Sequence, residues 1–304
     1  MINGLDAQSN YFLSNLKRIQ ERQDKVQREL GSGLRVNRAS DAPERVVDVL
    51  KLRSEIERST AIGVNLDRAT AEVDSAEAAV RVMVKIVERA RVLAAQTATD
   101  TAQNRRIVAI EARQLHEQLV SLTGTISEGR YVFSGDKDQT QLYASAWSQP
   151  GGIVRVDQAN NTRVLEDGNG SRFSLGRTAH QILDTRNLDD SFASDNVFNA
   201  VYSLAVALET DTVDDVRSAA ALLENAVNRL GEETTFYGHV QNRVRDAVTL
   251  NQNSLIARKK ELGQAQDTNV AEALVELNLA TVHQNAALGA QARRPTSSLF
   301  DFLA

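Results

Sequence analysis

The stretch ELGSGLRVNRASDAP, Glu29–Pro43, lies between two long segments whose composition predicts helix. Its Gly31-Ser32-Gly33 could belong to a glycine-rich phosphate loop or to a turn. A phosphate loop requires Gly-Lys-Ser or Gly-Lys-Thr after a strand and at the start of a helix, whereas these glycines follow a helix and continue as Leu-Arg-Val-Asn. The context therefore argues against nucleotide binding, and the stretch is predicted to join two helices.

The stretch contains residues that can end the first helix and residues that can begin the second. Gly31 or Gly33 is placed to end the first helix in a left-handed conformation. Ser40 or Asp41 is placed to cap the next, because Asp41-Ala42-Pro43-Glu44 has the spacing of a capping-box variant with proline in the first turn. The residues between the caps form an extended amphipathic piece: Leu34, Arg35, Val36, Asn37 and Arg38.

Outward from this connector, apolar residues follow the alternating three-and-four stride of a two-helix seam. In the first helix the stride runs through Ile2, Leu5, Ser9, Phe12, Leu16, Ile19, Gln23, Val26 and Leu30. In the second it runs through Leu66, Ala69, Val73, Ala76, Val80, Met83, Val87, Ala90 and Ala94. The second run, from about Pro43 to Ala98, predicts a helix on the order of 80 Å long.

A third helix is predicted from about Asn104 to Glu128, with one face formed by Val108, Ala112, Leu115, Leu119, Leu122 and Ile126. It must fold back on the second helix, because only the short polar turn TATDTAQN separates them. Helical patterning returns at Asp195 and continues to about Ala292. The last seam comprises Val270, Leu274, Leu277, Thr281, Gln284 and Leu288, beside a row of small residues at Ala273, Ala280 and Ala287.

Residues 129–190 contain the only tryptophan, Trp147, and glycine-rich turns between short alternating segments, which is typical of β-hairpins. The predicted fold is therefore mainly α: a long antiparallel helical rod or coiled-coil bundle formed by both chain ends, with a small β-rich inserted domain. The predicted segments are an N-terminal assembly helix with its connector (1–42), rod helices (43–135), the β-rich domain (136–190), returning rod helices (191–264) and a C-terminal assembly helix (265–304).

Composition excludes several kinds of chemistry. The net charge of -5 comes from 35 basic and 40 acidic residues mixed along the chain, so no basic face for nucleic acid is evident. Cysteine is absent, no apolar run reaches membrane-spanning length, and no cleavable signal peptide is readable. The four histidines show no metal-ligand spacing, and adjacent acids lie at expected helix starts, where they serve as caps. No catalytic, cofactor-binding or metal site is predicted, and neither is enzyme activity.

Chain ends are usually polar and frayed, whereas both ends of this chain are apolar on one face. Such ends are expected to pack on each other or on neighbouring subunits. The predicted subunit-interface residues are Ile2, Leu5, Phe12, Leu16, Ile19, Val26, Leu30, Leu34, Arg35, Asn37, Arg38, Val270, Leu274, Leu277, Leu288, Leu299 and Phe300.

The connector resembles the signature of the flagellin superfamily, which Leu30, Ser32, Gly33, Arg35, Asn37, Ser40 and Asp41 match. The segments VERARVLAAQTATDT and RRIVAIEARQLHEQLVSL are similar to the rod helices of that superfamily, and VAEALVELNLATVHQNAALGAQARRPTSSLFDFL is similar to its C-terminal assembly segment. The resemblance covers roughly the first 135 and last 70 residues. Within the superfamily, three segments resemble the hook–filament junction branch: Asn-Arg-Ala-Ser-Asp-Ala-Pro, the later Leu-Arg-Ser-Glu and GRYVFSGDKDQT.

The resemblance implies a non-enzymatic flagellar subunit that joins hook-associated proteins to the filament. It implies export unfolded, without a cleaved signal peptide, through a chaperone and the type III apparatus, and an extracellular homo-oligomeric ring between hook-associated protein 1 and flagellin. A filament-forming flagellin and, more remotely, a cytoplasmic coiled-coil adaptor are the alternatives. In flagellins, a rod surface binds an animal innate immune receptor; Arg89, Leu93 and Glu111 lie at matching positions, although ordinary rod packing also explains them.

Overall fold

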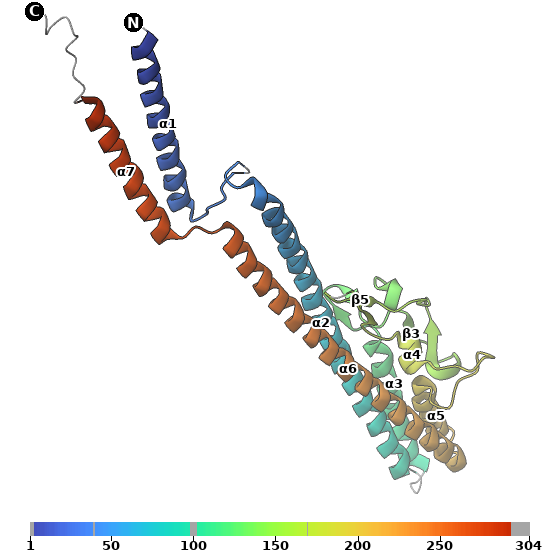
Figure 1. Ribbon diagram of the computed structural model, residues 1–304. Coiled ribbons are helices and arrows are strands. Elements are labelled where there is room, and N and C mark those ends of the chain that lie inside the picture. Colours follow the sequence, from blue (N-terminus) through green and yellow to red (C-terminus); the bar gives the residue numbers. More distant parts are fainter. Residues whose placement is uncertain (1–2, 39, 98–101, 169, 293–304) are drawn as a thin grey trace, which may run out of the picture. The chain divides into compact units, whose positions relative to one another are not determined.

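The chain forms two compact units. The computed structural model describes residues 3–38, 40–97, 102–168 and 170–292 (Figure 1). Unit 1 comprises Met1–Arg58 and Ser254–Ala304, and unit 2 comprises Ser59–Asn253. Two long helices, α2 (Pro43–Thr97) and α6 (Val213–Gln266), contribute residues to both units.

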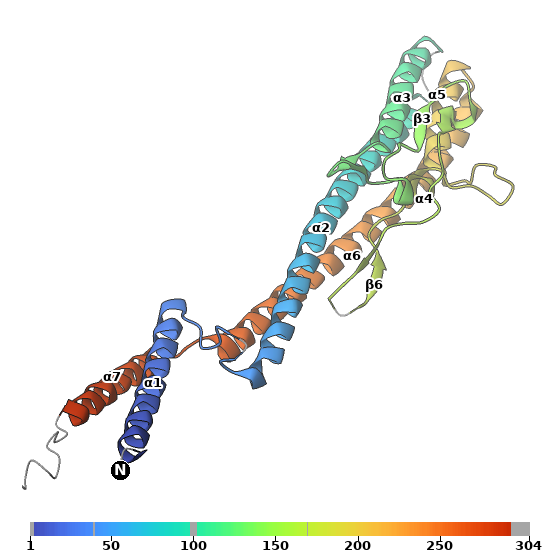
Figure 2. The same ribbon diagram turned by 90° about the horizontal axis from the view of Figure 1, so that it is seen from above.

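Unit 1 is built from pairs of antiparallel helices. Helix α1 (Asn3–Ser32) lies beside α7 (Val270–Ala292) in both ribbon views (Figures 1 and 2). The two helices run antiparallel, so the start of α1 and the end of α7 lie at the same end of the pair. The first turns of α2 pair with the last turns of α6, where Arg258 Nε lies 3.1 Å from Glu55 Oε2. The prediction that the two chain ends form helices that pack together is confirmed.

Unit 2 contains the main hydrophobic core. Every predicted seam position of α2 from Leu66 to Ala94 is buried, none more than 3% exposed. Helix α3 (Ala102–Leu122) and helix α5 (Val197–Glu209) pack against each other and complete this core with α6. The seam stride of the sequence therefore identified the buried face of α2 correctly, because small and medium aliphatic side chains recur there at the helical period.

The β-rich part of unit 2 consists of short antiparallel hairpins. Among the described residues, the strands pair two by two: β1 (Ile126–Ser127) with β2 (Arg130–Tyr131), β3 (Tyr143–Ser145) with β4 (Ile153–Arg155), and β5 (Val164–Glu166) with β6 (Arg172–Ser174). Short helical turns accompany them: η1 (Gly135–Lys137), η2 (Pro150–Gly152) and α4 (Ala179–Leu183). The mainly α fold with a small β-rich insertion is thus confirmed, while the segment boundaries remain predictions.

The predicted end of the third helix is wrong. The helix ends at Leu122 instead of Glu128, and Ile126 lies in β1 with its side chain exposed. The reason is the tight turn between β1 and β2, where Glu128 and Gly129 have φ angles of 48° and 79°. A glutamate in the left-handed region is uncommon, and glycine at the next position makes the two-residue hairpin turn possible.

A buried carboxylate ties the insertion to α5. Asp184 is 0% exposed and accepts hydrogen bonds from Tyr143 Oη (3.0 Å), Arg155 Nε (2.7 Å), Arg186 Nε (3.0 Å) and Asn196 Nδ2 (2.9 Å). Asn196 is also the N-cap of α5, because its side chain accepts a bond from the backbone N–H of Asn199. One side chain therefore links the β3–β4 hairpin, the end of α4 and the start of α5.

A second buried polar group, His116 of α3, lies among aromatic rings. Its Nε2–H donates to the Gly151 carbonyl at 2.8 Å, and Trp147, Phe198 and Tyr202 surround the ring. Gly152 allows this approach, because a Cβ there would lie 2.7 Å from His116 Cε1. Burial lowers the pKa of His116 below its usual value.

This lowered pKa gives unit 2 a specific dependence on pH. The unfolded chain binds a proton at His116 more tightly than the folded chain, so stability is lost as the pH falls below about 6.5. The variant His116→Gln can keep the bond to Gly151 without titrating. Between pH 6.5 and 5.5, chemical denaturation should show a steeper loss for the wild type than for the variant, by up to about 1.4 kcal/mol per pH unit. Equal slopes would show that folding does not lower the pKa of His116.

Candidate subunit interface

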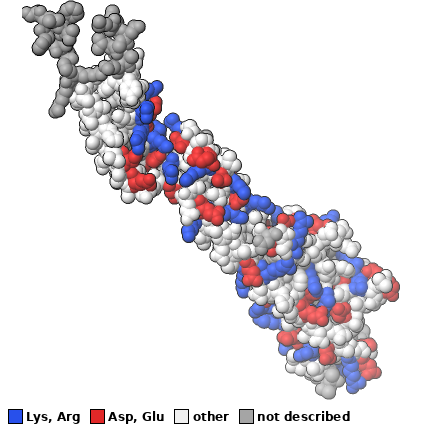
Figure 3. Space-filling model, in the orientation of Figure 1, with Lys and Arg blue, Asp and Glu red and all other residues white. Residues whose placement is uncertain are grey.

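Helix α7 exposes an apolar surface that its own chain leaves uncovered. Six of its large aliphatic side chains are 47–61% exposed: Val270, Leu274, Val275, Leu279, Val282 and Leu288. The helix contains only two formally charged residues, Glu272 and Glu276. In Figure 3 the surface formed by α7 is accordingly mostly white, while charged side chains follow α1. A helix that is apolar on more than one side is normally buried on more than one side, so this surface is a candidate for subunit contact.

Helix α1 covers the row of small residues on α7. Ala273 and Ala280 are 5% and 3% exposed, and Leu277, Gln284 and Ala287 are half-buried. On α1 the seam residues turn toward this row: Val26 is buried, and Phe12, Leu16, Ile19, Gln23 and Leu30 are half-buried. These predicted interface residues of α1 therefore already have a partner within the chain, whereas Val270, Leu274 and Leu288 of α7 face outward.

The sequence reading missed part of the exposed surface. Val275, Leu279 and Val282 were not among the predicted interface residues, although they are as exposed as Val270 and Leu274. Their spacing of four and three residues is itself a seam stride and was the available signal.

The connector between α1 and α2 is joined to the connector between α6 and α7. The backbone N–H groups of Arg35 and Val36 donate to the Gln266 carbonyl (2.7 and 3.4 Å), and that of Thr268 donates to the Gly33 carbonyl (2.9 Å). Leu34 and Asp267 form an antiparallel β-bridge. We call residues 33–42 with 267–269 the double connector.

Side chains strengthen the double connector. Gln266 is buried, and its Oε1 accepts a bond of 2.8 Å from Arg53 of α2. Val36 is buried, Leu34 is half-buried, and the amide nitrogen of Asn37 donates to the Leu34 carbonyl at 2.7 Å. The contacts of Leu34, Val36 and Asn37 thus lie within the double connector and stabilise its conformation.

The helix caps predicted in the connector are partly corrected. Gly33 has a φ of 72° and ends α1 as expected, and α2 begins at Pro43. Asp41, however, does not cap α2: its Oδ2 accepts bonds from the backbone N–H groups of Asn37 (3.1 Å) and Arg38 (2.7 Å). The aspartate folds back on the preceding loop because short polar side chains readily bond nearby backbone groups on either side.

The two arginines of the connector point to solvent. Arg35 and Arg38 are exposed, and within the described part of the chain neither guanidinium has a hydrogen bond or an ion pair. Their backbone groups are fixed by the bonds to Gln266 and Asp41, so two cationic side chains extend from a defined loop.

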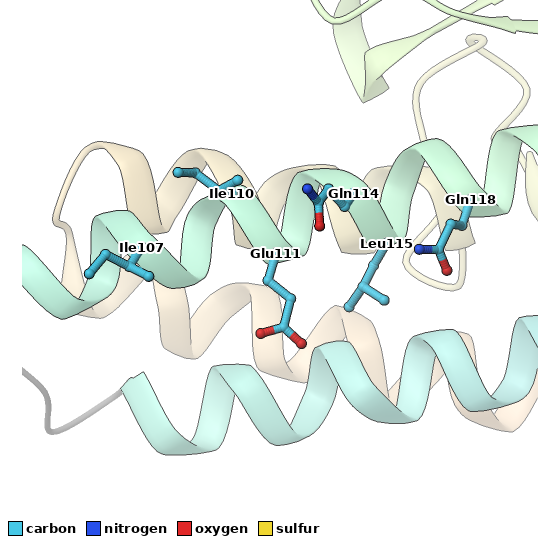
Figure 4. Close-up of a pocket in the computed structure, with 6 residues that line it drawn as sticks. All are labelled: Ile107, Ile110, Glu111, Gln114, Leu115 and Gln118. Carbon is cyan, nitrogen blue, oxygen red and sulfur yellow. The ribbon is translucent and has the colours of Figure 1, made fainter.

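The three residues considered for receptor binding do not form one exposed patch. Leu93 is 2% exposed in the core of unit 2, so its place on a receptor surface is corrected to rod packing. Arg89 Nε donates to Glu111 Oε1 at 2.7 Å, which joins α2 to α3. Figure 4 shows Glu111 directed toward α2, whereas Ile110 projects from the opposite side of α3. A shallow hollow of about 500 Å³ on α3 is lined by Ile107, Ile110, Glu111, Gln114, Leu115 and Gln118.

Some of the predicted interface residues lie outside the part of the chain that the structure describes. Ile2, Leu299 and Phe300 fall outside the described residues, as does the side chain of Leu5. In the described ranges, no helix is long and apolar enough to cross a membrane. No group of three histidine, cysteine or acidic side chains suited to a metal ion occurs among the described residues.

Comparison with known sequences matches part of this architecture to a family model. The sequence model of the bacterial flagellin N-terminal helical region matches residues 2–138, which include α1, the α1–α2 connector, α2 and α3. The flagellar filament 33 kDa core protein of Treponema phagedenis is 22% identical over 288 residues, 90% of each chain. Residues 2–138 of the chain thus match the N-terminal helical region of bacterial flagellins. Flagellin B of Helicobacter pylori strain J99 is 24% identical over 215 residues, which are 68% of this chain and 41% of that protein.

Solved structures show the same fold. A putative flagellar hook-associated protein of Vibrio parahaemolyticus has a TM-score of 0.64 at 19% identity, over 75% of this chain and 100% of that one. Flagellar hook-associated protein 3 of Legionella pneumophila has a TM-score of 0.60 at 14% identity, over 71% of this chain and 98% of that one. The fold of the chain is thus that of flagellar structural proteins.

Proposed function

We propose that this chain is a flagellin-superfamily structural subunit that joins hook-associated proteins to the flagellar filament, and that it has no enzyme activity. It would leave the cell without a cleaved signal peptide through the type III export apparatus, assisted by a chaperone. Outside the cell it would form a homo-oligomeric ring between hook-associated protein 1 and flagellin. The segments 1–42 and 265–304 would act as assembly segments in this ring.

The observation that carries the proposal is the uncovered aliphatic surface of α7. A free subunit leaves six large aliphatic side chains of this helix in water, and neighbouring copies in a ring would cover them. Burial of apolar area is the main driving force of such association. The fold likeness to hook-associated proteins, including the Legionella pneumophila protein, supports a place at the junction.

A filament-forming flagellin is the second candidate. It is favoured by the relatives that span 90% of this chain, which are named as filament proteins. The two candidate functions predict different locations of flagellin after deletion of the gene for this chain.

Deletion of the gene separates them. A junction subunit is needed before flagellin can polymerise, so the deletion strain should carry hooks without filaments and release soluble flagellin into the medium. Electron microscopy and immunoblotting of the medium measure both. A strain that lacks the chain but builds filaments of normal number and length would contradict the junction function.

The exposed arginines of the double connector provide a prediction about contact. In the double variant Arg35→Ala/Arg38→Ala, no contact within the described chain is lost, so the melting temperature should stay within about 2 °C of the wild type. Motility in soft agar should fall severalfold if the guanidinium groups bind a neighbouring subunit. The control is Arg53→Ala, which removes the bond to Gln266 and should loosen the connector itself. Full motility of the double variant would exclude the contact.

A further inference from the structure

Helix α7 turns a row of alanines to α1 and most of its large aliphatic side chains to solvent. The face toward α1 carries Ala273 and Ala280, whereas Val275, Leu279 and Val282 lie roughly on the opposite side of the helix at 3.6 residues per turn. Since apolar burial is roughly proportional to area, the opposite face would bury more surface if it were turned to α1. Burial alone therefore does not explain which face α1 covers.

A polar layer in the seam supplies an explanation. Gln23 interrupts the apolar seam of α1, and its Nε2 donates to Gln284 Oε1 at 3.1 Å and lies 3.4 Å from Thr281 Oγ1. Gln284 is a seam residue of α7 between Ala280 and Ala287, and both glutamines are half-buried. Next to this layer, Arg22 forms an ion pair with Glu276. A polar residue at one seam position lowers stability but specifies how two helices align.

The centre of the opposite face of α7, formed by Val275, Leu279 and Val282, offers Gln23 no hydrogen-bond partner, and Asn278 and Glu272 lie at its margins. Val275, Leu279 and Val282 have no polar side-chain atoms, so an amide turned against them would lose its hydrogen bonds and its contact with water. Only the alanine face brings Gln284 and Thr281 to Gln23. The polar layer thus distinguishes the two faces where apolar burial favours the other one.

We propose that Gln23 selects the alanine face of α7 and so keeps the surface of Val275, Leu279 and Val282 outward, free for a second copy of this chain. The second copy rests on the proposed function, whereas the choice of face is a property of the single chain. The second copy is the occupant that charge favours, because the nearly uncharged α7 surface matches another α7 better than the charged outer side of α1. Gln23 is therefore a positioning residue for assembly.

The chain contains no cysteine, so single cysteines can report which face is exposed. Ala280→Cys and Val282→Cys are introduced separately into the full-length chain, and their rates of thiol labelling are measured at a concentration where sedimentation shows a monomer. With Gln23 in place, the thiol of the Val282→Cys variant should react at least about tenfold faster than that of the Ala280→Cys variant. In the Gln23→Leu background, reaction at position 282 should slow at least about threefold while reaction at position 280 accelerates.

The slowing at position 282 is the decisive result. If Gln23→Leu merely separated α1 from α7, position 280 would become fast and position 282 would stay fast, which would overturn the proposal. Unchanged rates at both positions would overturn it as well. Gln20→Leu, the same substitution at an exposed site of α1, is the matched control and should change neither rate. The measurement needs no flagellum, so its outcome is independent of whether the chain acts at the junction.

Discussion

Cells whose only copy of the chain carries Leu279→Asp and Val282→Asp are expected to be non-motile. Both side chains are exposed in the single chain, so the free subunit should fold normally. In the ring, the same positions would be covered by a neighbouring copy, and two buried carboxylates without partners would oppose association strongly. Soft-agar swarming should be abolished, and electron microscopy should show hooks without filaments.

The matched control places two acids on the other terminal helix. Gln20→Asp and Gln27→Asp lie at exposed positions of α1, whose outer side already carries charges. This control should swarm at a rate close to the wild type, and both variants should melt within about 2 °C of it. Normal filaments in the α7 variant would show that the outer surface of α7 is not a subunit interface.

Replacement of Asp184 by asparagine is expected to give the largest loss of stability in unit 2. The buried carboxylate is bonded to two arginines, which are 26% and 17% exposed, and to Tyr143 and Asn196. Without the negative charge, Arg155 and Arg186 lose their buried counter-ion, and the amide offers only one acceptor oxygen. Breaking such a buried pair costs about 3–5 kcal/mol, which corresponds to a fall in melting temperature of roughly 6–20 °C for a unit of this size.

The same substitution at Asp214 is the control for this prediction. Asp214 pairs with Arg217 at 3.0 Å, but its side chain is 93% exposed, so the pair is screened by water. Asp214→Asn should change the melting temperature by no more than about 2 °C. Similar effects at the two positions in differential scanning calorimetry would show that the Asp184 cluster does not hold the insertion to α5.

Much of the helical fold could be predicted from the sequence because periodicity reports burial directly. Every side chain that the stride of α2 named from Leu66 to Ala94 is buried, although Ala79, Ile86 and Leu93 are buried beside that stride as well. The last part of the third helix could not be predicted in this way. Ile126 continued the helical stride, yet the Glu128-Gly129 turn formed a hairpin, and a local turn preference overrode the apolar period.

The interface was harder to predict, for two physical reasons. In α7, Leu277 and Gln284 belong to a stride through the alanines and also to one through Leu274 and Leu288, and periodicity alone cannot choose between them. The choice depends on Gln23, which is far away in the sequence. Asp41 shows the second reason: a short carboxylate can bond backbone groups before or after it, and the connector, instead of the helix, provided the partners.

A subunit with the proposed function would lie where the hook meets the filament. Immunogold labelling of sheared flagella, with an antibody raised against unit 2, tests this location most directly. A junction subunit should give a narrow band of label at the hook end of each filament and none along its length. Label distributed along the whole filament would contradict the junction function and would identify the chain as a filament flagellin.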